Sequence, residues 1–318
     1  MDLVFLGTSS GTPTKQRNVT GLALVADSGK AWYLVDCGEA TQHQLLHTPL
    51  SVNTLRAIFI THVHGDHCYG LPGLLASAAM SGRKDVLTIV APKGIETWVR
   101  TTLELTAVFL PFALEFLPTE SFGGWQDAEW KVESAPLSHR VPSHAYSFTE
   151  LQVEACLDSA RLGTEGVPQG PLWGRLKMGE DVTHAGRTLR SSDYLSYPHP
   201  ARKIVVGGDN DQAALLTACC QDAQVLVHEA TYTQEVADKA GASYGHSSAA
   251  SVAAFAETVG LPNLVLTHFS ARYQSDPNRS PCITDIQSEA ATHYKGQLFL
   301  AEDFARFRLS RSGQLSRV

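Results

Sequence analysis

The chain has 318 residues, of which 43% are hydrophobic and 18% are charged. This composition is typical of a globular protein and excludes a disordered or fibrous one. The net charge of −7 argues against a surface that is basic all over, the usual mark of nucleic-acid binding. No apolar run approaches the ~20 residues that a membrane span needs. The first residues, Met1–Gly7, lack the basic start and apolar stretch of a secretory signal, so we expect a cytoplasmic protein.

Positive charge is concentrated in one segment. Residues 160–203 contain seven Lys and Arg against four Asp and Glu, which leaves 18 of the 25 basic and 28 of the 32 acidic residues elsewhere. We therefore expect the positive potential to lie on this segment. The six cysteines show no CxxC pair and no regular spacing, which predicts free thiols instead of a disulfide framework or a thiolate zinc site.

Apolar runs of strand length, rich in β-branched residues, recur through both halves of the chain. They are Leu3–Leu6, Leu22–Val25, Trp32–Val35, Ala57–Ile60, Leu87–Val90, Lys203–Val206, Val225–Val227, Leu264–Leu266 and Leu298–Leu300. Helix-like stretches lie between several of them, at Gly94–Leu105, Ala213–Cys220 and Ser247–Val259, the last with a Ser-Ser N-cap candidate. This alternation indicates an α/β layered protein, which we expect to form a single domain over residues 1–318.

The segment from about Glu154 to Pro200 interrupts this alternation. It is rich in residues that break helices and strands, namely Gly163, Gly166, Pro168, Gly170, Pro171, Gly174, Gly179 and Gly186. These are too many breakers for a core element. We therefore predict that residues from about 154 to 200 form an inserted arm that protrudes from the α/β body.

The loop after the predicted strand Ala57–Ile60 holds three histidines and one aspartate within six residues. Neutral imidazole and carboxylate are the nitrogen and oxygen donors that Zn²⁺ accepts. His62 and His64 can converge on one ion, while Asp66 and His67 can turn toward a second ion after the flexible Gly65. The pattern HxHxDH after an apolar strand therefore predicts a metal centre.

Four ligands from one loop cannot complete two sites, so further ligands should stand at other strand ends. His139 follows the run Val132–Ser138, Asp209 follows the run that ends in Gly207-Gly208, and His268 follows Leu264–Thr267. Each has weak support alone, but their joint placement favours ligation. Two rivals are weaker candidates, because His144 begins the next strand and Asp211 stands where a helix would be capped.

Taken together, these features resemble the metallo-β-lactamase superfamily, whose fold is a four-layer αβ/βα sandwich with metals at one edge of two facing sheets. From Met1 to about Phe307 the chain is more narrowly similar to the short bacterial form of the ribonuclease Z family, the zinc phosphodiesterases also called ribonuclease BN. Five stretches carry this similarity: Phe5–Ser9, the PxKxRN loop Pro13–Asn18, the HEAT element His228–Thr231, the catalytic-histidine element Gly245–Ser247, and Ser270–Tyr273.

The predicted arm also fits the resemblance, because Gly166–Leu172 is similar to the Gly/Pro tip of the arm with which this family grips tRNA. One departure is Asn210-Asp211-Gln212, where the family commonly continues after Gly-Asp with Thr and a Pro-containing turn. This departure does not remove the ligand Asp209. It does leave the details of this loop open.

The resemblance implies two Zn²⁺ ions per subunit, with Mn²⁺, Co²⁺ or Fe²⁺ as metals that the same ligands accept. One ion would be held by His62, His64 and His139, the other by Asp66, His67 and His268, with Asp209 bridging them. The implied substrate is precursor tRNA, with no role for DNA or a membrane. The implied assembly is a homodimer in which the arm of one subunit serves the active site of the other.

The chemistry of such a site can be argued from the residues. Two cations roughly 3.5–4 Å apart can bind the oxygens of a phosphodiester and make a water between them more acidic. Asp66 would orient that water and take its proton, while His246, oriented by Glu229, would protonate the departing 3′-oxygen. The products would be a tRNA ending in a 3′-hydroxyl and a trailer beginning with a 5′-phosphate.

Substrate contacts are expected from two places. Near the metals we expect contacts from Lys15, Arg17, Asn18, Arg272 and Tyr273. On the arm we expect backbone phosphates to meet Arg175 and Lys177, together with Arg161, Arg187 and Arg190, in a contact by shape and charge without base reading. Solvated surface charge is the alternative for each basic residue.

Other functions share parts of this pattern. A thioester or lactam hydrolase would have the HxHxDH loop but no need for the arm or the PxKxRN loop. A diiron flavoprotein of the superfamily would carry Glu where this chain has His64. An RNA-binding module with a degenerate centre would lack ligands, whereas all seven expected ligands are present here.

Overall fold

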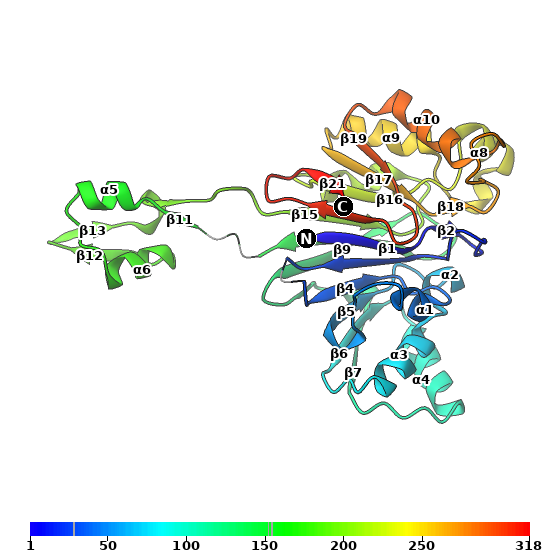
Figure 1. Ribbon diagram of the computed structural model, residues 1–318, viewed down its shortest axis with the longest axis horizontal. Helices are drawn as coiled ribbons and strands as arrows, with labels where there is room; N and C mark the ends of the chain where they lie inside the picture. Colours follow the sequence, from blue (N-terminus) through cyan, green and yellow to red (C-terminus); the bar gives the residue numbers. More distant parts are fainter. Residues whose placement is uncertain (28, 152, 154) are drawn as a thin grey trace.

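The computed structural model describes residues 1–27, 29–151, 153 and 155–318. In this part of the chain two facing sheets form a body from which an arm extends (Figure 1). The first sheet has the order β21 (Leu315–Arg317), β20 (Arg306–Leu309), β1 (Asp2–Gly7), β3 (Gly21–Val25), β4 (Trp32–Val35), β5 (Leu55–Phe59), β6 (Leu87–Ala91) and β7 (Leu114–Pro118). The second has the order β19 (Gln297–Leu300), β17 (Asn263–Thr267), β16 (Val225–Glu229), β15 (Lys203–Gly207), β10 (Ser143–Glu150), β9 (Trp130–Leu137) and β8 (Trp125–Gln126).

Helices cover the outer face of each sheet, which gives the four layers (Figure 1). On the first sheet lie α1 (Thr41–Leu45), α2 (Gly65–Cys68), α3 (Leu71–Met80) and α4 (Ile95–Leu105). On the second lie α7 (Thr217–Cys220), α8 (Gln234–Ala240), α9 (Ala249–Thr258) and α10 (Ile283–His293). Short 3₁₀ turns occupy η1 (Val52–Thr54), η2 (Thr119–Ser121), η3 (Ser191–Asp193), η4 (Ala213–Leu216) and η5 (Ala242–Tyr244).

Three apolar clusters hold these layers together. The central cluster lies between the sheets and includes Phe5, Phe59, Tyr146 and Val227, all buried, while one outer cluster packs each set of helices on its sheet. Strands β4 to β7 and β15, β16, β17 and β19 run parallel within their sheets. Parallel strands need crossover helices and are buried on both faces, which explains why their sequences read as continuous apolar runs.

Every predicted strand overlaps an observed one. The Ser-Ser N-cap expected before the predicted helix Ser247–Val259 is also confirmed. Helix α9 begins at Ala249, and its N-cap Ser248 accepts a hydrogen bond from the Ser251 N–H. The predicted helix over Ala213–Cys220 is instead split into η4 and α7. The interpretation of Asp211 as a helix cap is wrong, because Gln212 occupies the position before η4 and makes no side-chain cap.

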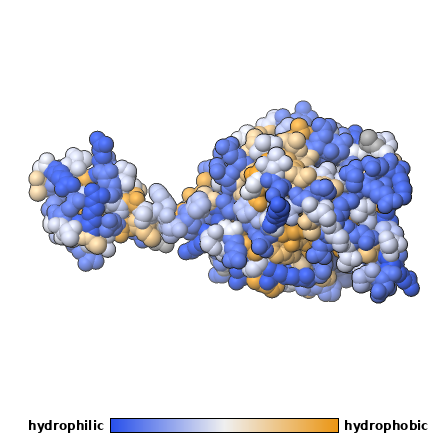
Figure 2. Space-filling view, turned by 90° about the horizontal axis from the view of Figure 1, so that it is seen from above, coloured by the Kyte–Doolittle hydropathy of each residue, from blue (hydrophilic) through white to orange (hydrophobic). Residues whose placement is uncertain are grey.

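The arm lies apart from the body on a narrow neck, and its surface mixes polar and apolar residues (Figures 1 and 2). Its elements are β11 (Cys156–Leu157), α5 (Ser159–Thr164), α6 (Pro171–Lys177), β12 (Val182–His184), β13 (Arg187–Leu189) and β14 (Leu195–Ser196). The arm has its own small core, made of the buried side chains Leu162, Val167, Leu176, Val182, Leu189 and Tyr194. The first residue of the predicted arm, Glu154, lies outside the described residues.

The root of the arm is fastened by Arg202. The arm leaves the body after β10, which ends at Glu150, and returns to it just before β15. The Arg202 side chain is 3% exposed and donates to both carboxylate oxygens of Glu150, at 2.6 and 3.0 Å, and to Asp27 at 2.7 Å. Arg202, on the chain segment that returns from the arm, is thus bound to Glu150, on the segment that enters it.

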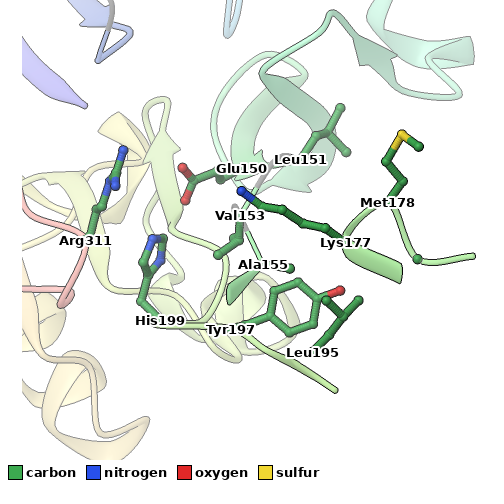
Figure 3. Close-up of a pocket in the computed structure, with 11 residues that line it drawn as sticks. Glu150, Leu151, Val153, Ala155, Lys177, Met178, Leu195, Tyr197, His199 and Arg311 are labelled. Atoms are coloured by element: carbon green, nitrogen blue, oxygen red, sulfur yellow. The ribbon is translucent and has the colours of Figure 1, made fainter. Parts of the chain in front are cut away.

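A cavity of about 770 Å³ opens at the same root. Figure 3 shows Lys177 reaching from the arm toward Glu150 and the body, with His199 and Arg311 on the far side of the cavity. The cavity lies away from the histidines of the HxHxDH loop, since none of its lining residues belongs to that loop. It therefore belongs to the arm and its attachment.

Two further expectations can be compared with the structure. All six cysteines lie within the described residues and are free thiols, as predicted. Among the helices of the described residues, none is long and apolar enough to cross a membrane.

Candidate metal centre

Strand ends of both sheets meet at one edge of the body and bring seven His and Asp side chains together. The loop after β5 and the residues that follow β9, β15 and β17 supply them: His62, His64, Asp66, His67, His139, Asp209 and His268. The two sheets face each other, so residues more than 200 positions apart become neighbours, as His67 and His268 do. All seven side chains predicted as ligands thus lie within one cluster.

One group in this cluster is formed by three imidazoles and one oxygen of Asp209. His64 Nδ1 lies 3.1 Å from His62 Nε2 and 3.2 Å from His139 Nε2. Asp209 Oδ2 lies 3.6 Å from His62 Nε2 and 3.8 Å from His139 Nε2. Donor atoms of a tetrahedral zinc with bonds of 2.0–2.1 Å are about 3.3 Å apart, so the spacing matches a single ion.

The second group is formed by Asp66, His67 and His268 with the other oxygen of Asp209. The Nε2 atoms of His67 and His268 are 3.2 Å apart, and Asp66 Oδ2 is 3.4 Å from each of them. Asp209 Oδ1 lies 3.4 Å from His67 Nε2 and 3.3 Å from His268 Nε2. Asp209 therefore presents one carboxylate oxygen to each group.

Hydrogen bonds to neighbouring groups determine which nitrogen faces the cluster in four of the five rings. Among the nitrogens that point away, His67 Nδ1 donates to Asp36 and His139 Nδ1 donates to the Gly245 carbonyl oxygen, both at 2.7 Å. His268 Nδ1 donates to Thr231 Oγ1 and His62 Nδ1 donates to Thr61 Oγ1, both at 3.0 Å. Because these nitrogens carry the ring protons, the inward nitrogens expose lone pairs. Lone pairs that face one another at 3.1–3.2 Å repel unless a cation lies between them. The residues therefore fit a divalent ion in each group.

The electrostatics of His62, His64 and Asp66 favour the same protonation states. His67 differs, because burial acts to lower its pKa but the carboxylates of Asp209, Asp36 and Asp66 raise it well above its ordinary value, so a bound cation would have to displace its Nε2 proton. Burial lowers the pKa of His62 well below its ordinary value, and the neighbouring imidazoles lower it further. Burial and His139 lower the pKa of His64 in the same way. Burial acts to raise the pKa of Asp66, but His67 and His268 outweigh it and hold that pKa well below its usual range. Neutral imidazole and ionised carboxylate are the forms that bind metal.

Asp36 is a site residue that the sequence reasoning missed. It follows β4, is buried, and accepts hydrogen bonds from the Thr61 N–H (2.8 Å), from Thr61 Oγ1 (2.9 Å) and from His67 Nδ1. Its φ of 59° is left-handed, a conformation that Asp adopts more readily than most residues. The available signal was an acidic residue directly after the buried run Trp32–Val35, at a strand end. Asp36 orients His67 instead of facing an ion.

Glu229 and His246 form a pair beside the first group. Glu229 ends β16, and His246 Nδ1 lies 3.1 and 3.0 Å from its two carboxylate oxygens. Burial acts to lower the pKa of His246, but the Glu229 carboxylate raises it to about 9, while His246 holds the pKa of Glu229 below its ordinary value. His246 Nδ1 is also 3.8 Å from Asp209 Oδ2. A protonated imidazole thus stands at the edge of the cluster.

The two rival ligands lie outside the cluster. His144 is in β10, where its Nδ1 is 3.4 Å from the carbonyl oxygen of Thr61. Asp211 is exposed, and its N–H donates to the carbonyl oxygen of Ser138 at 2.9 Å. The structure therefore favours His139 and Asp209 over them, as the sequence analysis did.

Two residues predicted to contact substrate, Arg17 and Tyr273, are buried in the structure. Arg17 is 7% exposed, and its guanidinium donates to the carbonyl oxygens of Ser270 (3.3 Å) and Tyr273 (2.8 Å). Tyr273 is 1% exposed, and its hydroxyl accepts a hydrogen bond from the Thr233 N–H at 2.7 Å. Arg17 ties the PxKxRN loop to the segment that follows His268.

The other predicted contacts near the cluster have polar atoms at the surface. Lys15 is exposed, and Arg272 is exposed with its guanidinium 5.1 Å from the centre of the Tyr232 ring. Asn18 is half-buried and donates from Nδ2 to the carbonyl oxygen of Glu39 at 2.8 Å. Gly11, two residues before the PxKxRN loop, touches the cluster, because its N–H donates to Asp66 Oδ2 at 2.8 Å.

The arm residues lie far from the cluster (Figure 1). Arg175 pairs with Glu180 at 2.7 Å, and Glu165 pairs with both Arg161 and Arg187 at 2.9 Å. Lys177 lines the cavity at the arm root. Much of the positive charge of the arm is therefore partnered by its own carboxylates.

Comparison with known proteins places this geometry in a family. The family described as "Anti-Pycsar protein Apyc1" matches residues 1–105, about a third of the chain. The Ribonuclease Z of Pseudomonas putida strain W619 is 59% identical over 318 residues, which cover 100% of this chain and 99% of that protein. Among solved structures, human tRNase Z, short form, is 27% identical with a TM-score of 0.65, covering 98% of this chain and 100% of that one.

A more distant structure extends the likeness of the fold. The metallo-β-lactamase fold protein YhfI from Bacillus subtilis is 17% identical with a TM-score of 0.64, covering 96% of this chain and 98% of that one. The four-layer architecture with histidines at one sheet edge is thus the metallo-β-lactamase fold, as predicted. With this fold and a relative matched over its whole length, the chain belongs to the ribonuclease Z family.

Proposed function

We propose that this protein is an endoribonuclease that removes the 3′ trailer from precursor tRNA and holds two Zn²⁺ ions in its histidine and aspartate cluster. The observation that carries the proposal is the pair of donor groups sharing Asp209, set beside the protonated His246. Family membership supports the substrate, because the human relative is named a tRNase Z. The same donors accept Mn²⁺, Co²⁺ or Fe²⁺.

In this proposal the first ion is held by His62, His64 and His139, the second by Asp66, His67 and His268, and Asp209 serves both. Bound ions would neutralise the charge of the phosphodiester and lower the pKa of a water between them. The ligands are held for this task by hydrogen bonds from their outward nitrogens. This chain's residues thus provide a rigid binding site with little reorganisation.

Asp66 and His246 have opposite proton-transfer roles in the proposal. Asp66 is partly accessible, with 11% of its side chain exposed, and in the proposal its carboxylate orients the attacking water and takes up its proton. His246 is protonated at neutral pH, and Glu229 accepts from its Nδ1, which leaves the Nε2–H to protonate the departing 3′-oxygen. The two groups act on opposite sides of the phosphorus.

We propose that the arm, over about residues 154–200, binds the body of the tRNA through backbone phosphates. Its separate position and the excess of three positive charges over residues 160–203 support this role. Lys15, Asn18 and Arg272 would contact the RNA near the cut. The assembly we propose is a homodimer, in which the arm of one copy serves the cluster of the other.

The test is incubation of the purified protein with a precursor tRNA and with bis(p-nitrophenyl) phosphate, each with and without a chelator. We expect metal-dependent cleavage of both substrates, and sequencing of the RNA ends should give a tRNA 3′-hydroxyl and a trailer 5′-phosphate. Hydrolysis of a lactam or thioester with neither phosphodiester cut would refute the proposal.

A further inference from the structure

Asn210 stands where the resemblance led us to expect threonine, directly after Asp209. It is completely buried, at 0% exposure. Its main chain bonds to the acid pair, because the Asn210 N–H donates to Glu229 Oε1 at 2.7 Å and its carbonyl oxygen accepts from Ser247 Oγ at 2.6 Å. Asn210 thus contacts both Glu229 and the residue after His246.

The side-chain amide of Asn210 joins two further segments. Its Oδ1 accepts from the N–H groups of Ser138 (3.2 Å) and Gln212 (3.1 Å), and its Nδ2 donates to His228 Nε2 at 3.0 Å. The two N–H donors require the oxygen on their side, so the amide can have only one orientation. Threonine offers a single hydroxyl and cannot span the acceptor and the donor positions together.

The state of His228 agrees with this orientation. His228 is completely buried, and burial lowers its pKa, so the ring is neutral. Its Nδ1 lies 2.8 Å from the carbonyl oxygen of Glu229 and donates to it, which leaves Nε2 as the acceptor that Asn210 Nδ2 requires. Every hydrogen bond in the set is therefore satisfied at the same time.

We propose that Asn210 is a positioning residue that holds Glu229 and His246 in the orientation needed for proton donation to the leaving oxygen. The inference rests on the proposed function, in which His246 is the acid. Asn210 fixes Glu229 directly and His246 through Ser247. It also fixes Ser138, the neighbour of His139, whose ring donates to Gly245 on the other side of His246. The residues before and after His246, Gly245 and Ser247, are therefore both held in place.

The physical consequence of losing the amide is specific. The partly buried N–H groups of Ser138 and Gln212 and the buried His228 Nε2 would lose their partner, and the loop would move to recover hydrogen bonds. A displacement of about 1 Å in a catalytic group costs on the order of 10²-fold in rate. Only substrates whose leaving group needs a proton would register the displacement of an acid.

The test compares Asn210→Ala and Asn210→Thr with the wild-type protein on two phosphodiesters. When precursor tRNA is cut, the leaving group is a ribose oxygen that needs a proton. When bis(p-nitrophenyl) phosphate is cut, the leaving group is p-nitrophenolate, which is stable without one. We expect kcat on RNA to fall about 10²-fold for Asn210→Ala with KM unchanged, and kcat on the phenolate ester and bound zinc to stay near wild type. For Asn210→Thr, kcat on RNA should also fall, but by a smaller factor. This variant tests the inference if the alanine variant does not fold.

Ser143→Ala is the matched control. Ser143 Oγ is buried and has no hydrogen-bond partner among the described residues, and its hydroxyl lies next to Gly208, close to Asp209. Its removal should leave both rates unchanged. Equal losses on both esters in the Asn210 variants, or no loss on RNA, would overturn the inference.

A readout without turnover completes the test. The Nδ1-bound proton of His246, hydrogen-bonded to Glu229, should give a downfield NMR resonance that is shifted or lost in Asn210→Ala and kept in Ser143→Ala. An unchanged resonance in Asn210→Ala would overturn the inference. Failure of the wild-type protein to cut any precursor tRNA would refute the proposed function instead, and the NMR comparison would still decide the role of Asn210.

Discussion

His246 is bound through Nδ1 by both oxygens of Glu229, so only Nε2 is free to act on a substrate. We expect His246→Ala to lower kcat on precursor tRNA by about 10²–10⁴-fold, the usual contribution of a general acid. The two metal ions that we propose should stay bound, because the ligand atoms of the two groups do not depend on this ring, and metal analysis of the variant checks this. Near-normal turnover of RNA would contradict the role of His246 as acid.

Asp36 acts one step away from the metals, since its carboxylate accepts from His67 Nδ1 and fixes which nitrogen of His67 faces the cluster. Asp36→Asn keeps the size of the side chain and the left-handed backbone, but the amide cannot stabilise the His67 proton in the same way. We expect metal affinity to fall by about 10–100-fold, measured by competition with a chromophoric chelator. Gln42→Ala, a change in the nearby α1, should leave the affinity unchanged.

The residues of the site differed in how far the sequence could predict them. The HxHxDH loop, His139, Asp209 and His268 were predictable because strand ends of parallel sheets converge at one edge. Asp36 was not, because a single aspartate after a strand has many structural uses. The burial of Arg17 could not be read from its motif either, since a basic residue in a loop looks the same whether it binds a phosphate or two carbonyl oxygens.

If the arm binds tRNA as proposed, its removal should separate binding from chemistry. Strand β11 pairs with β14, with Cys156 opposite Ser196. Replacing residues 156–196 by a short Gly/Ser linker therefore removes the arm together with its whole core. We expect cleavage of bis(p-nitrophenyl) phosphate to be spared and KM for precursor tRNA to rise sharply. Deleting only 163–187 would leave part of the arm core exposed and is the less clean test. Equal losses on both substrates would contradict a tRNA-binding arm.

The ion pair at the arm root makes the stability of this element depend on pH. Burial acts to raise the pKa of Glu150, but Arg202 holds it below its ordinary value of 4.5. A lowered folded-state pKa stabilises the fold above about pH 4.5, and this contribution is lost as the pH falls through the folded value. Arg202→Gln should therefore lower the free energy of unfolding by about 3 kcal/mol at pH 7 and by less at pH 3.

Urea unfolding of the two proteins at both pH values measures this difference. Arg100→Gln is the control, because its pair with Glu96 is about half exposed and worth at most about 0.5 kcal/mol. A loss for Arg202→Gln that is as large at pH 3 as at pH 7 would show that the pair with Glu150 is not its cause.

Elements in the body were predicted best where burial makes the pattern continuous. Strands β4 and β6 are buried along their whole length and β5 is buried from Ala57 to Phe59, so their sequences are almost continuously apolar. The pattern does not single out β7, an edge strand in which Glu115 interrupts the apolar run, or α10, whose first turn carries Asp285 and whose buried face is narrow. In the arm, glycines and prolines predicted a protrusion. The same residues interrupt the helical pattern, so the helices α5 and α6 were not predicted.

At the scale of the whole molecule, the ligand cluster joins the two sheets. His62 to His67 come from the first sheet, whereas His139, Asp209 and His268 come from the second. Ions bound only by the folded protein stabilise it by mass action, about 2.7 kcal/mol at a free concentration of 100 Kd. We therefore expect a chelator to lower the Tm of the protein and added Zn²⁺ to restore it, measured by calorimetry. A Tm that does not change on chelation would contradict a metal centre shared between the sheets.

The overall architecture was predictable because alternating strands and helices with a metal loop at a strand end leave few arrangements. The pairing of the two sheets was expected only from the family resemblance, since it depends on contacts between distant residues such as those in the central apolar cluster.

The separate core of the arm has a consequence for warm conditions. A cluster built on six buried side chains is far smaller than the clusters that hold the body, so it should give way at a lower temperature. Heating would then weaken the enzyme's hold on large RNA before it slowed the hydrolysis of small esters. On the proposed function, precursor tRNA would then go uncut at a temperature at which the catalytic machinery itself is still folded.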